Sequence, residues 1–155
     1  MKGNDKIIEA LNARLAEELT AINQYFVHAE MCDNWKYARL HEVIKKRAIA
    51  EMKHAEKLIE RILFLDGRPV VSTLNKLYIG AEVVEIHHND DGAEDMAIKG
   101  YNESIRVAVE VADNGTRDLL QSILEDEEEH IDWIEAQLDQ IAQVGAQNYL
   151  MEQIS

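Results

Sequence analysis

The chain has 155 residues, and its 30 acidic and 16 basic side chains give a formal net charge of −14, which excludes binding to a nucleic-acid backbone. No apolar run approaches the length of a membrane span, no signal-peptide core is present and Cys32 is the only cysteine, so we expect a cytoplasmic protein without disulfides or a cysteine-rich metal site. One proline, seven glycines and abundant Ala, Leu, Ile, Glu and Lys predict a single all-α domain over residues 1–155.

Five helical segments are predicted from apolar residues at helical spacing. They cover about residues 5–32, 35–65, a third stretch that ends near 112, 116–144 and 146–154. The second ends at a DGRP sequence, whose glycine and proline are stop signals. The fourth begins at Thr116, which is a favourable N-cap residue.

The connections between these helices predict the topology. Two short turns join the first helix to the second and the third to the fourth, so each pair forms an antiparallel hairpin. Residues 68–81 are too apolar for a slack linker. Extended, they reach about 45 Å, the length of a 30-residue helix. The second and third helices are therefore expected to be parallel, in a four-helix bundle with one long crossover connection and a short fifth C-terminal helix.

Six ionisable side chains interrupt the apolar faces of the four long helices. They are Glu18, Glu51, His54, Glu94, Glu127 and His130. Adding 76 to the first three numbers gives the last three, and each histidine follows its glutamate by three residues, so that the two share a helix face. Pseudo-symmetric packing of the two hairpins would bring all six together in the middle of the bundle.

Such a group cannot be buried without partners. Burying one bare carboxylate costs several kcal/mol, and four carboxylates facing two imidazoles leave an excess of negative charge. Two divalent cations would neutralise four carboxylates. Mixed oxygen and nitrogen ligands suit iron or manganese and also accept zinc. Two glutamates and two Glu-x-x-His pairs form the di-iron arrangement of carboxylate bundles.

Each part of this pattern also has an ordinary interpretation. A single Glu-x-x-His on an acidic helix is usually solvated, and the run DEEEH alone is compatible with a charged surface. Glu94 is also the third residue of a capping box that Asp91 would open. Two copies in register favour the metal interpretation. A zinc protease would need His-Glu-x-x-His, which is absent.

Several stretches resemble bacterioferritins, and the resemblance covers essentially the whole chain. It rests on MKG at the start and on ELTAINQYFVHAEM, EMKHAEKLIERILFLDG, DEEEHIDWIE and QNYL. The two Glu-x-x-His motifs separate this family from ferritins that have only one. The resemblance implies a hollow shell of 24 subunits built from twofold dimers. It also implies ferroxidase activity, in which Fe(II) is oxidised by O₂ or H₂O₂ at an intrasubunit di-iron centre and stored as Fe(III) mineral.

The same resemblance implies a role for each site residue. Glu18 and Glu94 correspond to terminal ligands, and Glu51 and Glu127 to ligands that bridge the two metals. His54 and His130 each correspond to the ligand of one iron. Tyr25 matches a tyrosine close to the centre that is positioned to supply an electron.

Met52 belongs to a different site. It lies about 100° around the helix from Glu51, so it cannot face the same bundle interior. Taken alone, a helical methionine is more often a packing residue. The resemblance implies that Met52 is an axial ligand of haem b, shared with its mate from a twofold-related subunit, and that a small ferredoxin is the reductant for iron release. Lys46 and Ala50 replace the His and Asp of relatives with an inner-surface iron site, so we expect that site to be missing.

One stretch of the third helix departs from good helical sequence. Asn, Asp, Asp and Gly at residues 89–92 are poor helix formers, so we expect an irregular helix just before Glu94. His87 and His88 are expected to be exposed.

Two other functions remain open at this point. One is a rubrerythrin-like di-iron peroxidase, although a rubredoxin domain would need cysteine pairs and Cys32 is alone. The other is a non-catalytic helical assembly that binds haem and structural zinc.

Overall fold

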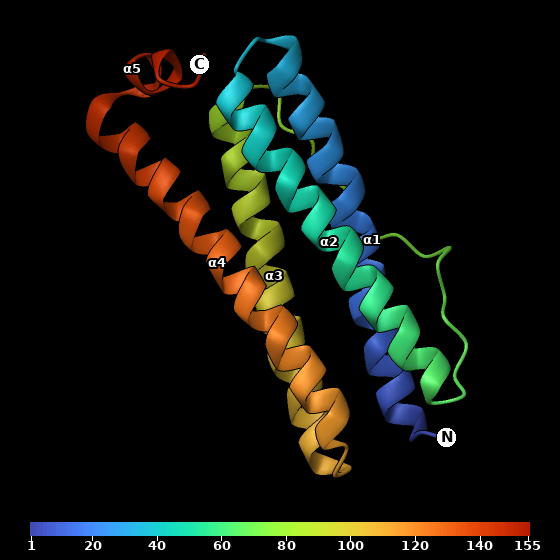
Figure 1. Ribbon diagram of the computed structural model, residues 1–155. Coiled ribbons are helices and arrows are strands. Elements are labelled where there is room, and N and C mark those ends of the chain that lie inside the picture. The colour runs from blue at the N-terminus through green and yellow to red at the C-terminus, as the bar shows by residue number, and fades with distance from the viewer.

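The computed structural model describes all 155 residues and is entirely helical apart from its connections. The helices are α1 (Asp5–Asn34), α2 (Ala38–Phe64), α3 (Val83–Glu110), α4 (Asn114–Val144) and α5 (Ala146–Met151). Helices α1 and α2 form one antiparallel hairpin and α3 and α4 the other, as Figure 1 shows. The long connection brings the chain back along the bundle, so α2 and α3 run in the same direction. The expected four-helix bundle with one crossover and a short fifth helix is confirmed.

The crossover between α2 and α3 is held against α1 by a row of polar side chains. These side chains accept hydrogen bonds from the crossover backbone: Asn12 from Val70, Thr20 from Asn75, Gln24 from Tyr78 and His28 from Gly80, at 2.8–3.1 Å. Thr20, Gln24 and His28 follow one another at intervals of four residues and therefore lie on one face of α1. The connection has no regular secondary structure, yet its path is fixed.

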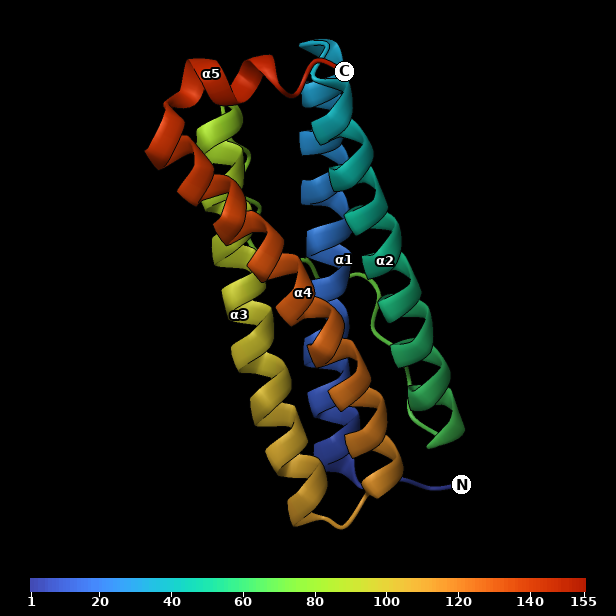
Figure 2. The ribbon, with the colours of Figure 1, turned by 60° about the vertical axis from the view of Figure 1, so that its left-hand side comes forward.

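Helix α5 lies across the end of the bundle near the turn between α1 and α2 (Figure 2). It is anchored by Tyr149, whose hydroxyl donates to Gln137 Oε1 at 2.7 Å and lies 3.0 Å from His87 Nε2. His87 is fully buried, so the expectation that it is exposed was wrong, whereas His88 is exposed. Burial lowers the pKa of His87 to about 4, which keeps the ring neutral in its contact with α5.

Helix α3 is continuous through residues 89–92, so the expected irregularity was also wrong. Asp90 is fully buried there and receives hydrogen bonds from Gln24 at 2.9 Å and from Arg47 at 3.0 Å. These tertiary bonds outweigh the low helix propensity of the segment. They also exclude the capping-box interpretation of Glu94, because Asp91 lies inside the helix and the N-cap is Glu82.

The first turns of α2 and α4 differ slightly from the prediction. Lys36 has a φ of 66°, which places it in the left-handed region and delays the start of α2 to Ala38. The N-cap of α4 is Asp113 rather than Thr116. The Asp113 side chain accepts a hydrogen bond from the Thr116 backbone N–H at 3.1 Å. Neither difference moves a residue of the central polar group.

Two apolar clusters fill the bundle on either side of its middle. One contains Ile7, Leu11, Leu58, Ile62 and Leu120, and the other contains Ala29, Leu40, Ile44, Val83 and Ile86. The polar side chains considered next lie between these clusters, where the surrounding packing holds them. No helix has both the length and the hydropathy to cross a membrane.

Candidate metal centre

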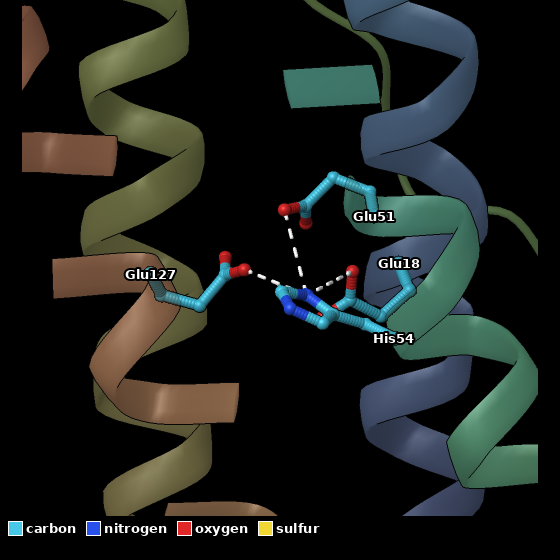
Figure 3. Close-up of side chains that lie close together, drawn as sticks. All are labelled: Glu18, Glu51, His54 and Glu127. Atoms are coloured by element: carbon cyan, nitrogen blue, oxygen red, sulfur yellow. Dashed lines mark ion pairs between the residues drawn. The ribbon is translucent and has the colours of Figure 1, made fainter. Parts of the chain in front are cut away.

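The structure brings all six ionisable side chains of the repeat together in the middle of the bundle. Each long helix contributes: α1 provides Glu18, α2 provides Glu51 and His54, α3 provides Glu94, and α4 provides Glu127 and His130. The four glutamates are each 1% exposed. Figure 3 shows Glu18, Glu51 and Glu127 converging on the His54 ring from three different helices.

The six residues form two overlapping groups. Glu18, Glu51, His54 and Glu127 make one group, and Glu51, Glu94, Glu127 and His130 make the other. Within each group the ligand atoms lie within 4.8 Å of one another. Glu51 and Glu127 belong to both, which is the placement that a pair of bridging carboxylates requires.

The imidazoles face the carboxylates through the same ring nitrogen. His54 Nδ1 lies 3.0 Å from Glu127 Oε1 and 3.6 Å from Glu18 Oε2. His130 Nδ1 lies 3.2 Å from Glu51 Oε1 and 3.4 Å from Glu94 Oε1. The two rings are stacked, with centroids 6.3 Å apart. Each imidazole therefore offers one nitrogen to its own group of carboxylates.

Every residue of the centre has a buried polar atom without a hydrogen-bond partner. These atoms are Glu18 Oε2, Glu51 Oε1, His54 Nδ1, Glu94 Oε2, both carboxylate oxygens of Glu127, and His130 Nδ1. Leaving one buried polar atom unpaired costs about 1–3 kcal/mol, and native proteins contain few such atoms. Seven of them facing one another would be satisfied by cations. The donor set of carboxylate oxygens and imidazole nitrogens therefore fits two divalent metal ions.

The acid–base properties of the centre reflect the same crowding. Burial, with repulsion from the neighbouring carboxylates, raises the pKa of Glu51 well above its usual range. Burial and the charge of Glu127 raise the pKa of Glu94 to about 8. Burial disfavours a charged His54, but the nearby carboxylates of Glu127 and Glu18 outweigh that effect and raise the pKa of His54 to about 11. Protons therefore hold the metal-free centre together, and metal ions would displace them.

Two tyrosines hold the two glutamates that are not shared between the groups. The Tyr25 hydroxyl donates to Glu94 Oε1 at 2.7 Å, and the Tyr101 hydroxyl donates to Glu18 Oε1 at 2.5 Å. In each carboxylate the bond leaves Oε2 without a hydrogen-bond partner. Both rings are buried, and burial raises the pKa of each hydroxyl, which keeps it a donor.

Tyr101 was missed by the sequence reasoning. It follows Tyr25 by the same 76 residues that relate the ligands, so the offset applied to the whole first half would have found it. The role of Arg47 in supporting Tyr25 was also not predicted from the sequence. Arg47 turns inward, bonds Asp90 at 3.0 Å and lies with its guanidinium 4.9 Å from the centre of the Tyr25 ring, a cation–π contact that helps fix the ring.

Asp126 was the third omission. Its carboxylate lies 2.8 Å from His54 Nε2, the ring nitrogen that points away from the centre. The DEEEH interpretation as a surface run concealed this contact, because Asp126 is itself about half exposed.

Comparisons with known proteins agree with this arrangement. Residues 8–144 match the family model of the ferritin-like domain. The bacterioferritin of Brucella melitensis is 41% identical over 96% of this chain and 92% of its own length. Those of Rhodobacter capsulatus and Mycobacterium tuberculosis are 39% and 37% identical, over 97% and 100% of this chain and 94% and 98% of their own lengths. The chain belongs to the bacterioferritin family.

Met52 of this bacterioferritin-family chain points outward from α2 and not toward the centre. Its side chain is 47% exposed, whereas the neighbouring Glu51 is 1% exposed. Ile49, one turn earlier, is also exposed, and Ile22 and Phe26 of α1 are partly buried. The expectation that Met52 points away from the metal ligands is confirmed.

Two openings reach the bacterioferritin-family centre from outside. A cavity of about 460 Å³ between α1, α3 and the crossover is lined by Glu18, Glu51 and Glu127 at its inner end. A depression of about 660 Å³ between α2 and α4 reaches His54 and His130. Ions and small oxidants thus have access to both the carboxylate side and the imidazole side.

Proposed function

We propose that this protein stores iron and oxidises Fe(II) to Fe(III) at an intrasubunit di-iron centre. The observation that carries the proposal is the convergence of seven unpartnered buried ligand atoms in two groups that share Glu51 and Glu127. Membership of the bacterioferritin family supports iron as the metal. Carboxylates with one imidazole per metal are hard and intermediate ligands, which suit Fe(II) and Fe(III) alike.

The ligands divide naturally between two Fe(II) ions, which we treat as substrates. Glu18 and His54 bind one ion, Glu94 and His130 bind the other, and Glu51 and Glu127 bridge them. With H₂O₂, two Fe(II) give one electron each, and two protons complete the conversion of peroxide to two waters. The protons that the metal-free centre carries on His54 and Glu94 leave as the ions bind.

The tyrosine hydroxyls keep the two terminal carboxylates in place during this exchange. The Tyr101 hydroxyl holds Glu18 Oε1 and leaves Oε2 without a partner, whereas the Glu94 oxygen that Tyr25 holds is also the one that lies 3.4 Å from His130 Nδ1. Tyr25 also lies within hydrogen-bond distance of a ligand of the second ion. With O₂, reduction to two waters takes four electrons and four protons: two electrons come from the Fe(II) ions of the centre, and we propose that Tyr25 supplies one more and a third Fe(II) the last.

The storage part of the proposal concerns the assembly. We infer a cytoplasmic shell of 24 subunits built from twofold dimers, with ferric mineral inside. Haem b would bind between two subunits through Met52 and the same methionine of a twofold-related subunit, on the exposed apolar face of α2. Held by two thioethers, the haem would supply electron transfer. A small ferredoxin is the proposed source of electrons for iron release.

Fe(II) oxidation by the metal-free protein tests the proposal. The wild type should oxidise Fe(II) rapidly with O₂ or H₂O₂, and His130→Ala should remove the fast phase while the helical content is unchanged. His41→Ala is the matched control, since that ring bonds the Ala29 carbonyl at 2.9 Å near the α1–α2 turn. Equal rates for wild type and His130→Ala would contradict the assignment.

Particle size and iron content separate storage from the other functions. A shell of 24 subunits that retains many irons per subunit supports storage. A dimer that holds two metals per chain and reduces peroxide would instead support the rubrerythrin-like peroxidase. Zinc bound tightly without any Fe(II) oxidation would support a structural centre.

A further inference from the structure

The two metal positions of the centre are not equivalent, although their ligands repeat. The position served by Glu18 and His54 and the position served by Glu94 and His130 contain the same residue types, related by the offset of 76. The difference lies in what supports each imidazole from behind. This inference rests on the proposed di-metal function and concerns how the two ions share the centre.

His54 is supported by a carboxylate. Its Nδ1 faces the ligand oxygens, and its Nε2 lies 2.8 Å from Asp126 Oδ2. A cation at Nδ1 requires that nitrogen to be free of a proton, so the ring proton must lie on Nε2, where Asp126 accepts it. The bond therefore selects the tautomer that binds metal and fixes the orientation of the ring.

His130 has no such support. Adding 76 to 50 gives 126, so the residue that corresponds to Asp126 in the first half is Ala50. Ala50 has no acceptor to offer, and the structure gives His130 Nε2 no hydrogen-bond partner. The His130 side chain is also 17% exposed, whereas that of His54 is 4% exposed. This ring is held only on the side that faces the glutamates.

We propose that Asp126 is a positioning residue that makes the His54 position the tighter of the two metal positions. Carboxylate partners of metal-bound histidines orient the ring and raise its basicity, and their loss costs about 10–100-fold in metal affinity. The first ion is then bound by Glu18, His54 and the shared carboxylates. The second ion occupies a position whose imidazole must still be ordered.

A crossed set of variants tests this inference with Co(II), a redox-inactive probe, added to the metal-free assembled protein. Two binding steps alone decide nothing, because shared carboxylates couple the ions even in a symmetric centre. Each position is therefore isolated, the His54 position in His130→Ala and the His130 position in His54→Ala. Asp126→Ala should weaken binding by about 10–100-fold in the first background and leave it unchanged in the second.

The matched control is Glu129→Ala, which removes one negative charge from the same depression without touching a bond to either histidine. It should change both backgrounds equally and only slightly. Asp126→Ala effects that are equal in the two backgrounds would show a general charge effect and overturn the inference. No effect in either background would overturn it as well.

A gain-of-function variant provides the complementary test. Ala50→Asp places a carboxylate at the position related to Asp126 and should tighten Co(II) binding at the His130 position by about 10–100-fold, measured in the His54→Ala background. Unchanged affinity there would contradict the inference while the centre itself stands. Failure of the wild-type protein to bind Co(II) at all would instead contradict the proposed function.

Discussion

The two hairpins of the bundle have the same residue types at the ligand positions and at the tyrosines that hold them, and they differ at outward positions such as Met52. Tyr25 of the first hairpin corresponds to Tyr101 of the second, and both donate to a glutamate of the opposite hairpin. Met52, by contrast, corresponds to Glu128, and both are exposed. The repeat is thus preserved by the requirements of the shared polar centre and not by those of the surface.

Ala50 and Asp126 are a pair that differs next to the ligands themselves. Their positions lie behind the two histidines, one layer beyond the ligands, where one hairpin provides a carboxylate and the other does not. A comparison limited to the ligands would describe a symmetric centre. Including the residues behind the histidines gives two positions of different metal affinity, and the following experiments test where the two hairpins are equivalent and where they are not.

The largest effect is expected where the two halves share a ligand. Glu51→Ala removes a carboxylate from both groups and should abolish high-affinity binding of two ions and the fast oxidation of Fe(II). The loss should exceed the roughly 10–100-fold typical of an outer partner. Anaerobic Co(II) titration and stopped-flow oxidation measure it. Glu56→Ala, an exposed acid on the same helix, is the control, and a Glu51→Ala protein with wild-type titration would contradict the shared role.

The next effect concerns the outward position at which the halves differ. Met52→Leu should give a protein without haem that still oxidises Fe(II) rapidly, because the Met52 side chain points outward whereas Glu51 faces the bundle interior. The haem absorption spectrum and the iron-release rate with an external reductant measure the change. Met96→Leu, also an exposed methionine, should keep haem. Haem at full occupancy in Met52→Leu would refute the axial-ligand assignment.

Replacing the two tyrosines tests whether each hairpin holds a carboxylate of the other hairpin in place. Tyr25→Phe should weaken the ion bound by Glu94 and His130, whereas Tyr101→Phe should weaken the ion bound by Glu18 and His54. Each change removes one hydrogen bond to a carboxylate, worth about 1.5–3 kcal/mol. Co(II) titration in the His54→Ala and His130→Ala backgrounds resolves the two positions. Effects on the same position in both variants would contradict the crosswise arrangement.

The smallest effect is on the pH dependence of stability. Burial raises the folded-state pKa of Glu94 to about 8. Against the effect of burial, the nearby carboxylates of Glu127 and Glu18 raise the pKa of His54 to about 11. Between the ordinary and the raised pKa of each group, the native metal-free protein therefore binds more protons than the unfolded chain. This pH interval is 4.5 to about 8 for Glu94 and 6.5 to about 11 for His54. The stability of the metal-free protein should fall as pH rises through these intervals. Thermal unfolding between pH 6 and 9 measures the trend, with Glu94→Gln as the comparison that flattens it.

Metal should reverse this trend, because cations replace the protons and bind more tightly as pH rises. The unfolding temperature of Zn(II)-loaded protein should therefore be nearly constant or increase over the same interval. A metal-free protein that becomes more stable with rising pH would contradict the description of the centre as proton-filled.

Much of this structure could be predicted from the sequence, because the decisive signals are periodic. Apolar spacing gave the helices, and the offset of 76 placed Glu18, Glu51 and His54 with their counterparts. The crossover path was predicted from the length and the apolar content of residues 68–81. The side chains that hold it, such as Thr20 and His28, have partners on the backbone more than 50 residues away, and no local pattern reveals such bonds.

The errors share a physical cause: polar residues that the local sequence suggests are solvent-exposed or helix-breaking form hydrogen bonds with distant parts of the fold. Asp90 sits inside a helix because Gln24 and Arg47 bond its side chain. His87 is buried because Tyr149 of α5 provides its partner. Asp126 was not singled out from the acidic residues around it, and only the fold shows that His54 lies beside it.

The most direct test of the central claim is the stoichiometry of the fast oxidation. Metal-free protein is loaded with increasing Fe(II) without oxygen and then mixed with H₂O₂ or O₂, and the amplitude of the fast phase is followed. The two overlapping ligand groups predict an amplitude that rises to two Fe(II) per chain and then saturates. Saturation at one Fe(II) per chain, or no fast phase, would contradict a centre that joins the two hairpins through shared carboxylates.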